Sequence, residues 1–345
     1  MTMKFQPYHN FAELESLKDP WNQLLGHSAS DVPFLTFEYQ QAWWQTRGGG
    51  EWPEDSQLVI ITATQDDRLV GIAPLFFAQN LTGQPALMFV GAVEVSDFLD
   101  FIVDPQDLHP FLSGLLDFLS VDNDLPHWEV LDLHNLLESS PTLALLEFEA
   151  KKRGWEHQQT YLQPAPYISL PADYETYLAG LDKKQRHEIR RKYRNVENSL
   201  AEADFYIVED RDQLERETQA FIEMMAQDPS KRGFLTEPMV QHLHNTARIA
   251  FEHGWLQLSF FTLDGKKAAG HLSFLFNNRL WGYNSGWEWA FRDYSPGWVH
   301  LAHLIQWSIE QGLTEFDFMR GDEDYKYKFG GVDRHVHRAT LTRGI

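Results

Sequence analysis

The same succession of predicted elements occurs twice along this chain of 345 residues. In both copies, apolar and β-branched runs separated by turn residues predict a strand, a hairpin, further strands, a helix and a closing strand. The first copy has predicted strands at residues 58–64, 69–77, 86–90, 98–103 and 128–133, and helices at 108–120 and 141–153. The second has predicted strands at 255–263, 267–276, 279–285, 315–319 and 335–341, and a helix from 296 or 297 to 311. Because the copies lie more than about 150 residues apart, they indicate a duplicated domain, not short stacked repeats.

The boundary between the copies is expected near residues 164–171, where Gln163-Pro164-Ala165-Pro166 interrupts regular structure. The sequence therefore predicts a mixed α/β protein with two domains, residues 1–165 and residues 166–345. Three more helices are expected early in the second domain, at residues 181–201, 213–227 and 237–252.

The charge of the chain is strongly negative, with 29 Lys and Arg against 50 Asp and Glu, a net charge of −21. Such a chain repels nucleic acids and anionic membranes on average, so a polyanion must meet a local basic patch. The predicted helix at 181–201 offers one, because Lys183, His187, Arg190 and Arg194 follow each other along one face. This stripe is either a solvated helix face or a docking surface for a phosphate-bearing substrate or donor.

Cysteine is absent, which excludes disulfides, thiolate zinc sites and a cysteine nucleophile. No signal peptide is recognisable at residues 1–7, and apolar runs such as 73–78 are too short to cross a bilayer. We therefore expect a soluble, cytoplasmic protein without membrane insertion. His335-Val336-His337 and His242-Leu243-His244 have spacings that permit metal binding, but no third ligand accompanies them, so no metal site is predicted.

The segment from residue 287 to 299 is the best candidate for an anion-binding loop. Ser295-Pro296-Gly297 there precedes an amphipathic helix: proline suits the first turn, Ser295 can cap it, and Gly297 allows close approach of a ligand. Free amides and the dipole at this helix start would hold a pyrophosphate, and Arg292 could add a charge-assisted contact. The alternative is that Ser-Pro-Gly only starts a helix.

The corresponding loop in the first copy has a different character. Asp104-Pro105-Gln106-Asp107 contains no glycine and is acidic, so it is expected to repel a phosphate. The difference predicts one donor site per chain, in the second domain.

Several stretches together carry a family resemblance. They are Gly71-Ile72-Ala73-Pro74-Leu75, Ser96-Asp97-Phe98-Leu99-Asp100, residues 178–197, Ser295-Pro296-Gly297, residues 312–318, Arg320-Gly321-Asp322-Glu323 and Tyr325-Lys326. In this order and spacing, over about residues 30 to 335, the chain resembles the BioF-like acetyltransferase domain of CelD-like proteins, related to the FemAB-like aminoacyl transferases. The element order around residues 287–299 also resembles that of the GNAT superfamily of N-acetyltransferases.

The resemblance implies two tandem GNAT-like lobes with a cleft between them and acetyl-coenzyme A, or another acyl-coenzyme A, as donor. The GNAT loop that wraps the pyrophosphate has a basic residue followed by glycines. Arg292 and Gly297 match that order, whereas Trp298 or Val299 replaces the second glycine. The donor-binding residues expected from the loop and the resemblance are Arg292, Ser295, Gly297, Trp298 and Val299.

Acyl transfer to an amine needs a neutral amine, a polarised carbonyl and a protonated leaving group. Asp317 could orient or deprotonate the acceptor, or could instead cap backbone amides. Tyr325 could protonate the leaving group and Lys326 could neutralise a phosphate or an oxyanion. The alternative, which we favour less, is that both belong to a surface hairpin. In the first domain, Asp97 or Asp100 could bind the acceptor or lie at a solvated edge. Arg190 and Arg194 of the basic stripe complete the predicted substrate contacts.

We therefore predict an acyltransferase that moves an acyl group from acyl-coenzyme A to an amine or hydroxyl of a small molecule, sugar or cell-envelope precursor. Direct attack is expected because no cysteine can form a covalent intermediate. One alternative is a FemAB-like transferase with aminoacyl-tRNA as donor, which would use the basic helix and depend steeply on salt. Another alternative is a non-catalytic binding or scaffold protein that keeps the fold.

Overall fold

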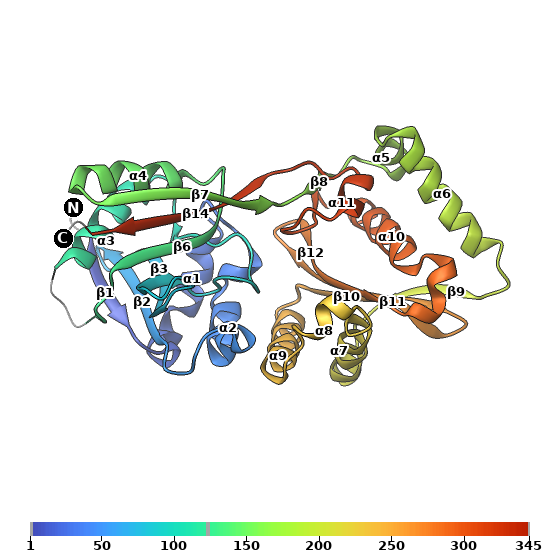
Figure 1. Ribbon diagram of the computed structural model, residues 1–345, viewed down its shortest axis with the longest axis horizontal. Helices are drawn as coiled ribbons and strands as arrows, with labels where there is room; N and C mark the ends of the chain where they lie inside the picture. The colour runs from blue at the N-terminus through green and yellow to red at the C-terminus, as the bar shows by residue number, and fades with distance from the viewer. Residues whose placement is uncertain (1–2, 122–124, 344–345) are drawn as a thin grey trace. The chain divides into compact units, whose positions relative to one another are not determined.

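The computed structural model describes residues 3–121 and 125–343 (Figure 1). It divides into two compact units. One contains the chain up to Gln163 together with the segment from His335 onward, and the other contains Pro164–Arg334. Each unit has a mixed sheet with helices packed against it, which confirms the predicted α/β class.

The first unit contains a sheet with strand order β1-β2-β3-β4-β6-β14-β7, in which β5 pairs with β3. Neighbours from β1 to β4 are antiparallel, and β4 and β6 are parallel. The strands are β1 (Lys4–Tyr8), β2 (Gln57–Gln65), β3 (Arg68–Gln79), β4 (Pro85–Phe89), β5 (Ile102–Val103), β6 (Val130–Leu137), β7 (Glu156–Pro164) and β14 (His335–Thr342). The helices are η1 (Phe11–Leu17), α1 (Lys18–Leu25), η2 (Pro33–Leu35), α2 (Phe37–Gly50), α3 (Leu108–Ser120) and α4 (Pro141–Arg153).

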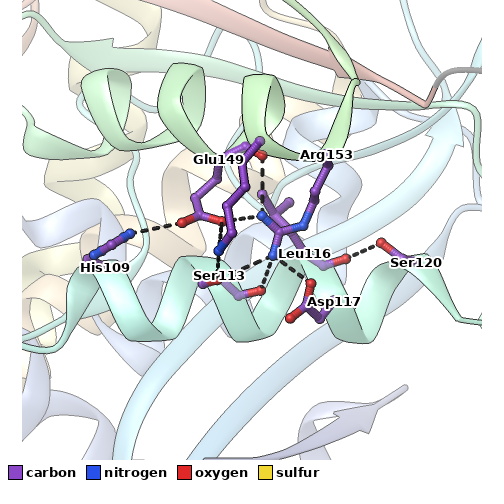
Figure 2. Close-up of polar contacts among 8 residues, drawn as sticks. His109, Ser113, Leu116, Asp117, Ser120, Glu149 and Arg153 are labelled. Atoms are coloured by element: carbon purple, nitrogen blue, oxygen red, sulfur yellow. Dashed lines mark hydrogen bonds and ion pairs between the residues drawn. The ribbon is translucent and has the colours of Figure 1, made fainter.

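Helix α3 packs on this sheet through an apolar stripe that includes Phe111 and Leu115. Gly71 on β3 makes the close approach possible, because a Cβ atom there would lie 2.3 Å from the Phe111 ring. Helices α3 and α4 are joined by a polar cluster centred on the buried Glu149 (Figure 2). His109 Nε2 lies 2.8 Å from Glu149 Oε1, and Arg153 binds Glu149 as well as Asp117, so the buried carboxylate is compensated.

The second unit contains a sheet with strand order β8-β13-β12-β11-β10-β9. Its strands are β8 (Tyr167–Ser169), β9 (Ala203–Ile207), β10 (Leu256–Leu263), β11 (Lys266–Phe276), β12 (Arg279–Trp287) and β13 (Glu315–Asp317). Its helices are α5 (Tyr174–Gly180), α6 (Lys183–Glu197), α7 (Arg211–Met225), α8 (Pro229–Arg232), α9 (Glu237–Glu252), η3 (Trp289–Tyr294), α10 (Pro296–Glu310) and α11 (Asp324–Lys328).

Alternation along β10 assigns the two faces of this sheet. Leu258 and Phe260 pack in the cluster formed with α7 and α9, whereas Phe261 and Leu263 pack in the cluster that includes Val299 of α10. Figure 1 shows α7 and α9 on one side of the sheet and α10 with α6 on the other. The sheet is therefore covered on both faces. Helix α10 follows β12 after the short helix η3.

Two predicted strands differ in the structure. The last strand is predicted to belong to the sheet of the second copy, but β14 pairs antiparallel with β6 in the first unit. Val336 lies opposite Leu137, so the pairing joins segments that are remote in sequence. Of the predicted strand at 98–103 only Ile102–Val103 forms, and Phe98 has a φ of 61°, which interrupts extended structure. The predicted helix at 296 or 297 to 311 is confirmed as α10.

Candidate active site

A cavity of about 360 Å³ lies at the start of α10 within the second unit. It is lined by the end of β12, by the middle of β11, by the loop into α10 and by α11. The lining residues are Ala269, Gly270, His271, Ser285, Gly286, Trp287, Arg292, Ser295, Pro296, Gly297, Trp298, His300, Leu301, Tyr325 and Phe329. We call it the donor cavity, after the predicted role of this loop.

Strand β12 extends beyond the end of its neighbour β13, so the two strands separate beside this cavity. The two strands pair in parallel only from Arg279 to Trp281, opposite Glu315 to Asp317. Beyond Trp281, β12 continues to Trp287 and keeps its pairing with β11 on the other side. Gly286 is required there, since a Cβ atom would lie 2.8 Å from the backbone nitrogen of Met225. The unpaired edge of β12 thus faces the cavity.

The helix start differs from the prediction at Ser295. This residue has left-handed backbone angles, φ 51° and ψ 52°, and its side chain makes no capping hydrogen bond. Its carbonyl oxygen instead accepts hydrogen bonds from the amides of Trp298 and Val299, both at 3.1 Å. Pro296 has no N–H group. The amide of Gly297 is therefore the remaining donor of the first turn, and it has no hydrogen-bond partner among the described residues. One free donor at the positive end of α10 therefore opens on the cavity.

Aromatic side chains form the walls around that donor. Trp298 packs on Phe329 with ring centres 4.7 Å apart, and Lys192 Nζ of α6 lies 4.1 Å from the centre of the Trp298 ring. Trp298 Nε1 is buried and has no hydrogen-bond partner in the described chain. Arg292 is exposed and lines the same cavity, with its Nε 3.9 Å from Asp293 Oδ1. These groups surround the cavity at the loop for which the sequence predicts a donor site.

Val299 is placed differently from the prediction. Its amide donates a hydrogen bond to the carbonyl oxygen of Ser295. Its side chain is 1 % exposed and packs in the core cluster with Phe261 and Ala269. It does not line the donor cavity, because it follows Trp298 on the helix and points to the sheet.

A second cavity, of about 520 Å³, shares Ser285, Gly286, Trp287 and Tyr325 with the donor cavity. We call it the acceptor cavity, after the role that we propose for it. Its other lining residues are Met224, Gln227, Asp228, Pro229, Ser230, Lys231, Trp289 and Glu323. The end of β12 and the Tyr325 side chain therefore contribute to both spaces.

Tyr325 is the predicted site residue that the structure best supports, since it lines both cavities. It lies on α11, where its ring contacts Phe318 edge-on. Desolvation by the surrounding protein, together with the Glu323 carboxylate, raises the pKa of the phenol above its ordinary value. The hydroxyl is therefore protonated at neutral pH.

Lys326 is not available to a ligand, contrary to the prediction. The side chain is 2 % exposed, and Nζ donates to the carbonyl oxygens of Met319, Arg320 and Gly321 at 3.1, 2.7 and 3.2 Å. It also pairs with Glu323 at 2.8 Å. With its donors used in this way, the ammonium fixes the loop before α11 instead of binding a phosphate.

Replacing Lys326 by methionine is expected to lower the free energy of unfolding by about 1.5–3 kcal/mol, because hydrogen bonds to a charged group are lost and buried carbonyls are left unpaired. Lys328→Met is the matched control, since Lys328 is more exposed and pairs only with Asp324 on the surface. Urea denaturation of both variants measures the difference. Equal, small losses would show that Lys326 does not organise the loop.

Asp317 also has a structural environment. It is fully buried on β13, its Oδ1 accepts the amide of Met319 at 2.7 Å, and its Oδ2 pairs with Arg334, which also binds Glu315 at 2.8 Å. It does not line either cavity. These contacts favour the alternative in which the carboxylate caps a backbone amide.

The acidic pair of the first unit is held by its own surroundings. Asp100 is 1 % exposed and accepts hydrogen bonds from Ser30, Ser140 and Thr142 at 3.1, 2.5 and 2.7 Å, while burial raises the pKa of its carboxyl group. Asp97 is buried as well. Both belong to the loop before β5, so the prediction of a solvated edge is wrong, and Asp100 has the contacts of a structural carboxylate.

The basic stripe on α6 is exposed but partly neutralised. Arg190 pairs with Glu175 at 2.7 Å, and Arg194 Nε donates to the carbonyl oxygen of Arg190 at 3.3 Å. Neither lines the donor cavity. Lys192 of the same helix is the residue that contacts the site, through Trp298.

Sequence reasoning missed two histidines that line the donor cavity, His271 of β11 and His300 of α10. His271 Nδ1 lies 2.8 Å from Ser273 Oγ, and His300 Nε2 lies 3.0 Å from Ser259 Oγ. The spacing of His271 and Ser273 on one face of a strand was the available signal. Burial lowers the pKa of both, to about 3 for His271, so neutral imidazoles lie below the cavity.

Acid is expected to destabilise the second unit through these imidazoles. In the unfolded state His271 takes up a proton below its ordinary pKa of 6.5, whereas in the folded protein it does so only near pH 3. The free energy of unfolding therefore falls as the pH drops below 6.5. The loss for this group is up to about 1.4 kcal/mol per pH unit. Denaturation of wild type and His271→Gln between pH 7 and 5 measures it. A variant with the same pH slope as wild type would contradict the assignment.

Within residues 3–121 and 125–343, no group of three or more His, Cys, Asp or Glu is arranged to hold a metal ion. No helix in that part of the chain is long and apolar enough to cross a membrane.

Residues 183–327 match a family model described as an acetyltransferase (GNAT) domain. The match runs from the start of α6 into α11 and includes all lining residues of both cavities except Phe329. A comparison with curated proteins found no sequence match.

The fold matches several solved structures along most of the chain. The structure of FemX has 13% identity and a TM-score of 0.65, covering 93% of this chain and 95% of its own. A conserved protein of unknown function from Bacteroides thetaiotaomicron has 13% identity and a TM-score of 0.62, covering 99% and 100%. A tandem GNAT protein from the clavulanic acid biosynthesis pathway has 12% identity and a TM-score of 0.50, covering 99% of each chain. The chain thus has a tandem GNAT-like fold, and its residues 183–327 match the model of the GNAT acetyltransferase domain family.

Proposed function

We propose that this protein is an acyltransferase that moves an acetyl or other acyl group from coenzyme A to an amine or hydroxyl acceptor. The observation that carries the proposal is the free Gly297 amide at the start of α10, which faces the donor cavity. Tyr325 lines both this cavity and the acceptor cavity. The donor pyrophosphate would accept a hydrogen bond from this amide and a contact from Arg292. The buried Trp298 Nε1 supplies another donor without a partner.

In the proposed reaction, the acceptor nucleophile attacks the thioester carbonyl from the acceptor cavity. The new bond forms between the acceptor nitrogen or oxygen and the acyl carbon, the carbon–sulfur bond breaks, and Tyr325 gives its proton to the leaving thiolate. The proton lost by the acceptor returns to Tyr325 through solvent, so the enzyme is regenerated. Direct attack suits a chain without cysteine.

We place the donor site in the second unit alone. The predicted lobe of residues 166–345 is kept as a proposal only as far as Arg334, because the segment from His335 onward belongs to the first unit. In the loop before α3 of the first unit, the backbone amide of Gln106 donates a hydrogen bond to Asp104 Oδ1 at 3.0 Å. The Asp104 carboxylate would repel a phosphate. The donor is an intracellular metabolite, so we propose a cytoplasmic location and a small-molecule, sugar or cell-envelope precursor as acceptor.

A second candidate function is transfer from aminoacyl-tRNA. The exposed arginines of α6 favour it, and the fold is similar to that of FemX. Against it, Glu175 and Glu188 neutralise Arg190 and Arg191, which leaves a weaker basic surface. Binding of tRNA that falls steeply with salt would favour this donor, whereas no binding at low salt excludes it.

The proposal is tested by calorimetric titration with acetyl-coenzyme A and by thiol release in the presence of a panel of amines. We expect saturable binding with one site per chain and thiol release that depends on the amine. Binding without release over the panel would favour a scaffold that keeps the fold, and absence of binding would refute the donor site.

A further inference from the structure

Lys231 is a half-buried ammonium for which the described residues provide no ion-pair partner. It lies on α8 and lines the acceptor cavity. Its Nζ donates to the carbonyl oxygen of Ser285 at 2.7 Å and to Asn284 Oδ1 at 3.2 Å, and both acceptors are neutral. No carboxylate in the described parts of the chain forms an ion pair with it. One of its three N–H groups remains available to a ligand.

The carboxylates nearest to Lys231 are engaged elsewhere. Asp228 Oδ1 accepts hydrogen bonds from the amide and the hydroxyl of Ser230 at 2.9 and 2.7 Å. Glu323 pairs with Lys326 at 2.8 Å. Burial lowers the pKa of Lys231, and the charges of Asp228 and Glu323 oppose that shift only from a distance. A partly buried cation in this position is stabilised when a ligand brings a negative charge.

We propose that the acceptor cavity binds a carboxylate of the acceptor through Lys231, so that the acceptor is an amine or alcohol that also carries a carboxylate. This inference rests on the proposed function, because it assigns the cavity to the acceptor. A carboxylate suits the site better than a phosphate, since a single ammonium faces it and two further carboxylates line the cavity, which would repel a dianion.

The position of Lys231 explains how such a group would orient the acceptor. The lysine is hydrogen-bonded to Ser285, one of the three residues of β12 that line both cavities. Tyr325 lines both as well, so a carboxylate fixed at Lys231 directs the other end of the acceptor toward the donor. Trp287 and Trp289, stacked with ring centres 5.2 Å apart, add an apolar wall for the body of the acceptor.

The test compares acceptors that differ only in this charge. Glycine, β-alanine, 4-aminobutyrate and glycylglycine are each paired with their primary amide, and thiol release from acetyl-coenzyme A gives kcat/KM. Quenching of the tryptophan fluorescence gives acceptor binding in parallel. We expect at least one acid to exceed its amide by about 10–100-fold, the effect of a hydrogen bond to a charged group. Equal values for every acid and its amide, in turnover and in binding, would overturn the proposal.

Variants of Lys231 give the second arm. Lys231→Met is expected to remove the preference for the acid, Lys231→Arg to keep most of it, and Arg232→Met, an exposed neighbour, to leave it unchanged. The wild-type comparison stands even if Lys231→Met does not fold. Titration with acetyl-coenzyme A separates the two proposals. If the donor does not bind wild type, the proposed function fails; if it binds and amines react without preference for the acid, only this inference fails.

Discussion

Replacing Gly297 by aspartate is expected to weaken the binding of acetyl-coenzyme A by on the order of 100-fold, because a hydrogen bond to a charged group is blocked and a like charge is added. The protein itself has room for the side chain, since the nearest atom to a Cβ at this position is Trp287 Cδ1 at 3.6 Å. A carboxylate in the first turn of a helix stabilises it by about 0.3–1 kcal/mol. Donor affinity and folding stability should therefore change in opposite directions.

Calorimetric titration and urea denaturation measure the two effects. Gly180→Asp is the matched control: it adds the same charge at a glycine with no atom within 4 Å of a built Cβ, and Gly180 does not line the donor cavity. It should leave donor affinity unchanged. Equal affinity of Gly297→Asp and wild type would remove the helix start from the donor site.

Removing the Tyr325 hydroxyl in Tyr325→Phe is expected to lower kcat by about 10²–10⁴-fold, the contribution typical of a positioned general acid, with little change in KM or in donor affinity. The ring that packs on Phe318 is retained, so the fold should not change. Because the pKa of the phenol is raised, the hydroxyl stays protonated across neutral pH, and the wild-type rate should not fall from its ionisation there.

Steady-state kinetics with wild type, Tyr325→Phe and Tyr327→Phe test this role. Tyr327 lies on the same helix and donates to Asp333 at 2.9 Å, but it does not line either cavity. It should keep nearly full turnover. A proportional loss of kcat and donor affinity in Tyr325→Phe would assign Tyr325 to binding instead of proton transfer.

Local signals in the sequence predicted the elements that build the site. Pro296 after a serine, followed by an amphipathic run, predicted α10, and Asp264-Gly265 predicted the turn between β10 and β11. These features depend on neighbours in sequence, which is why they were accessible. The pairing of β14 with the first unit was not, because strand partners are decided by contacts between remote segments.

The same distinction applies to the side chains of the site. Tyr325 and Lys326 are adjacent, yet one lines both cavities and the other is buried under three carbonyl oxygens. A one-residue step along α11 turns the side chain by a quarter to a third of a turn, so composition alone could not separate them. Lys231 lies in no motif, and its place at the site follows only from the contact of α8 with β12. For His271 the sequence offered only its spacing with Ser273 on one face of a strand, which does not reveal a cavity.

The most direct test of the donor site at α10 is a crystal structure with acetyl-coenzyme A bound. We expect the pyrophosphate within hydrogen-bond distance of the Gly297 amide and the thioester beside Tyr325. Phosphates bound at the basic face of α6 or in the first unit, with the cavity at the start of α10 left empty, would contradict it.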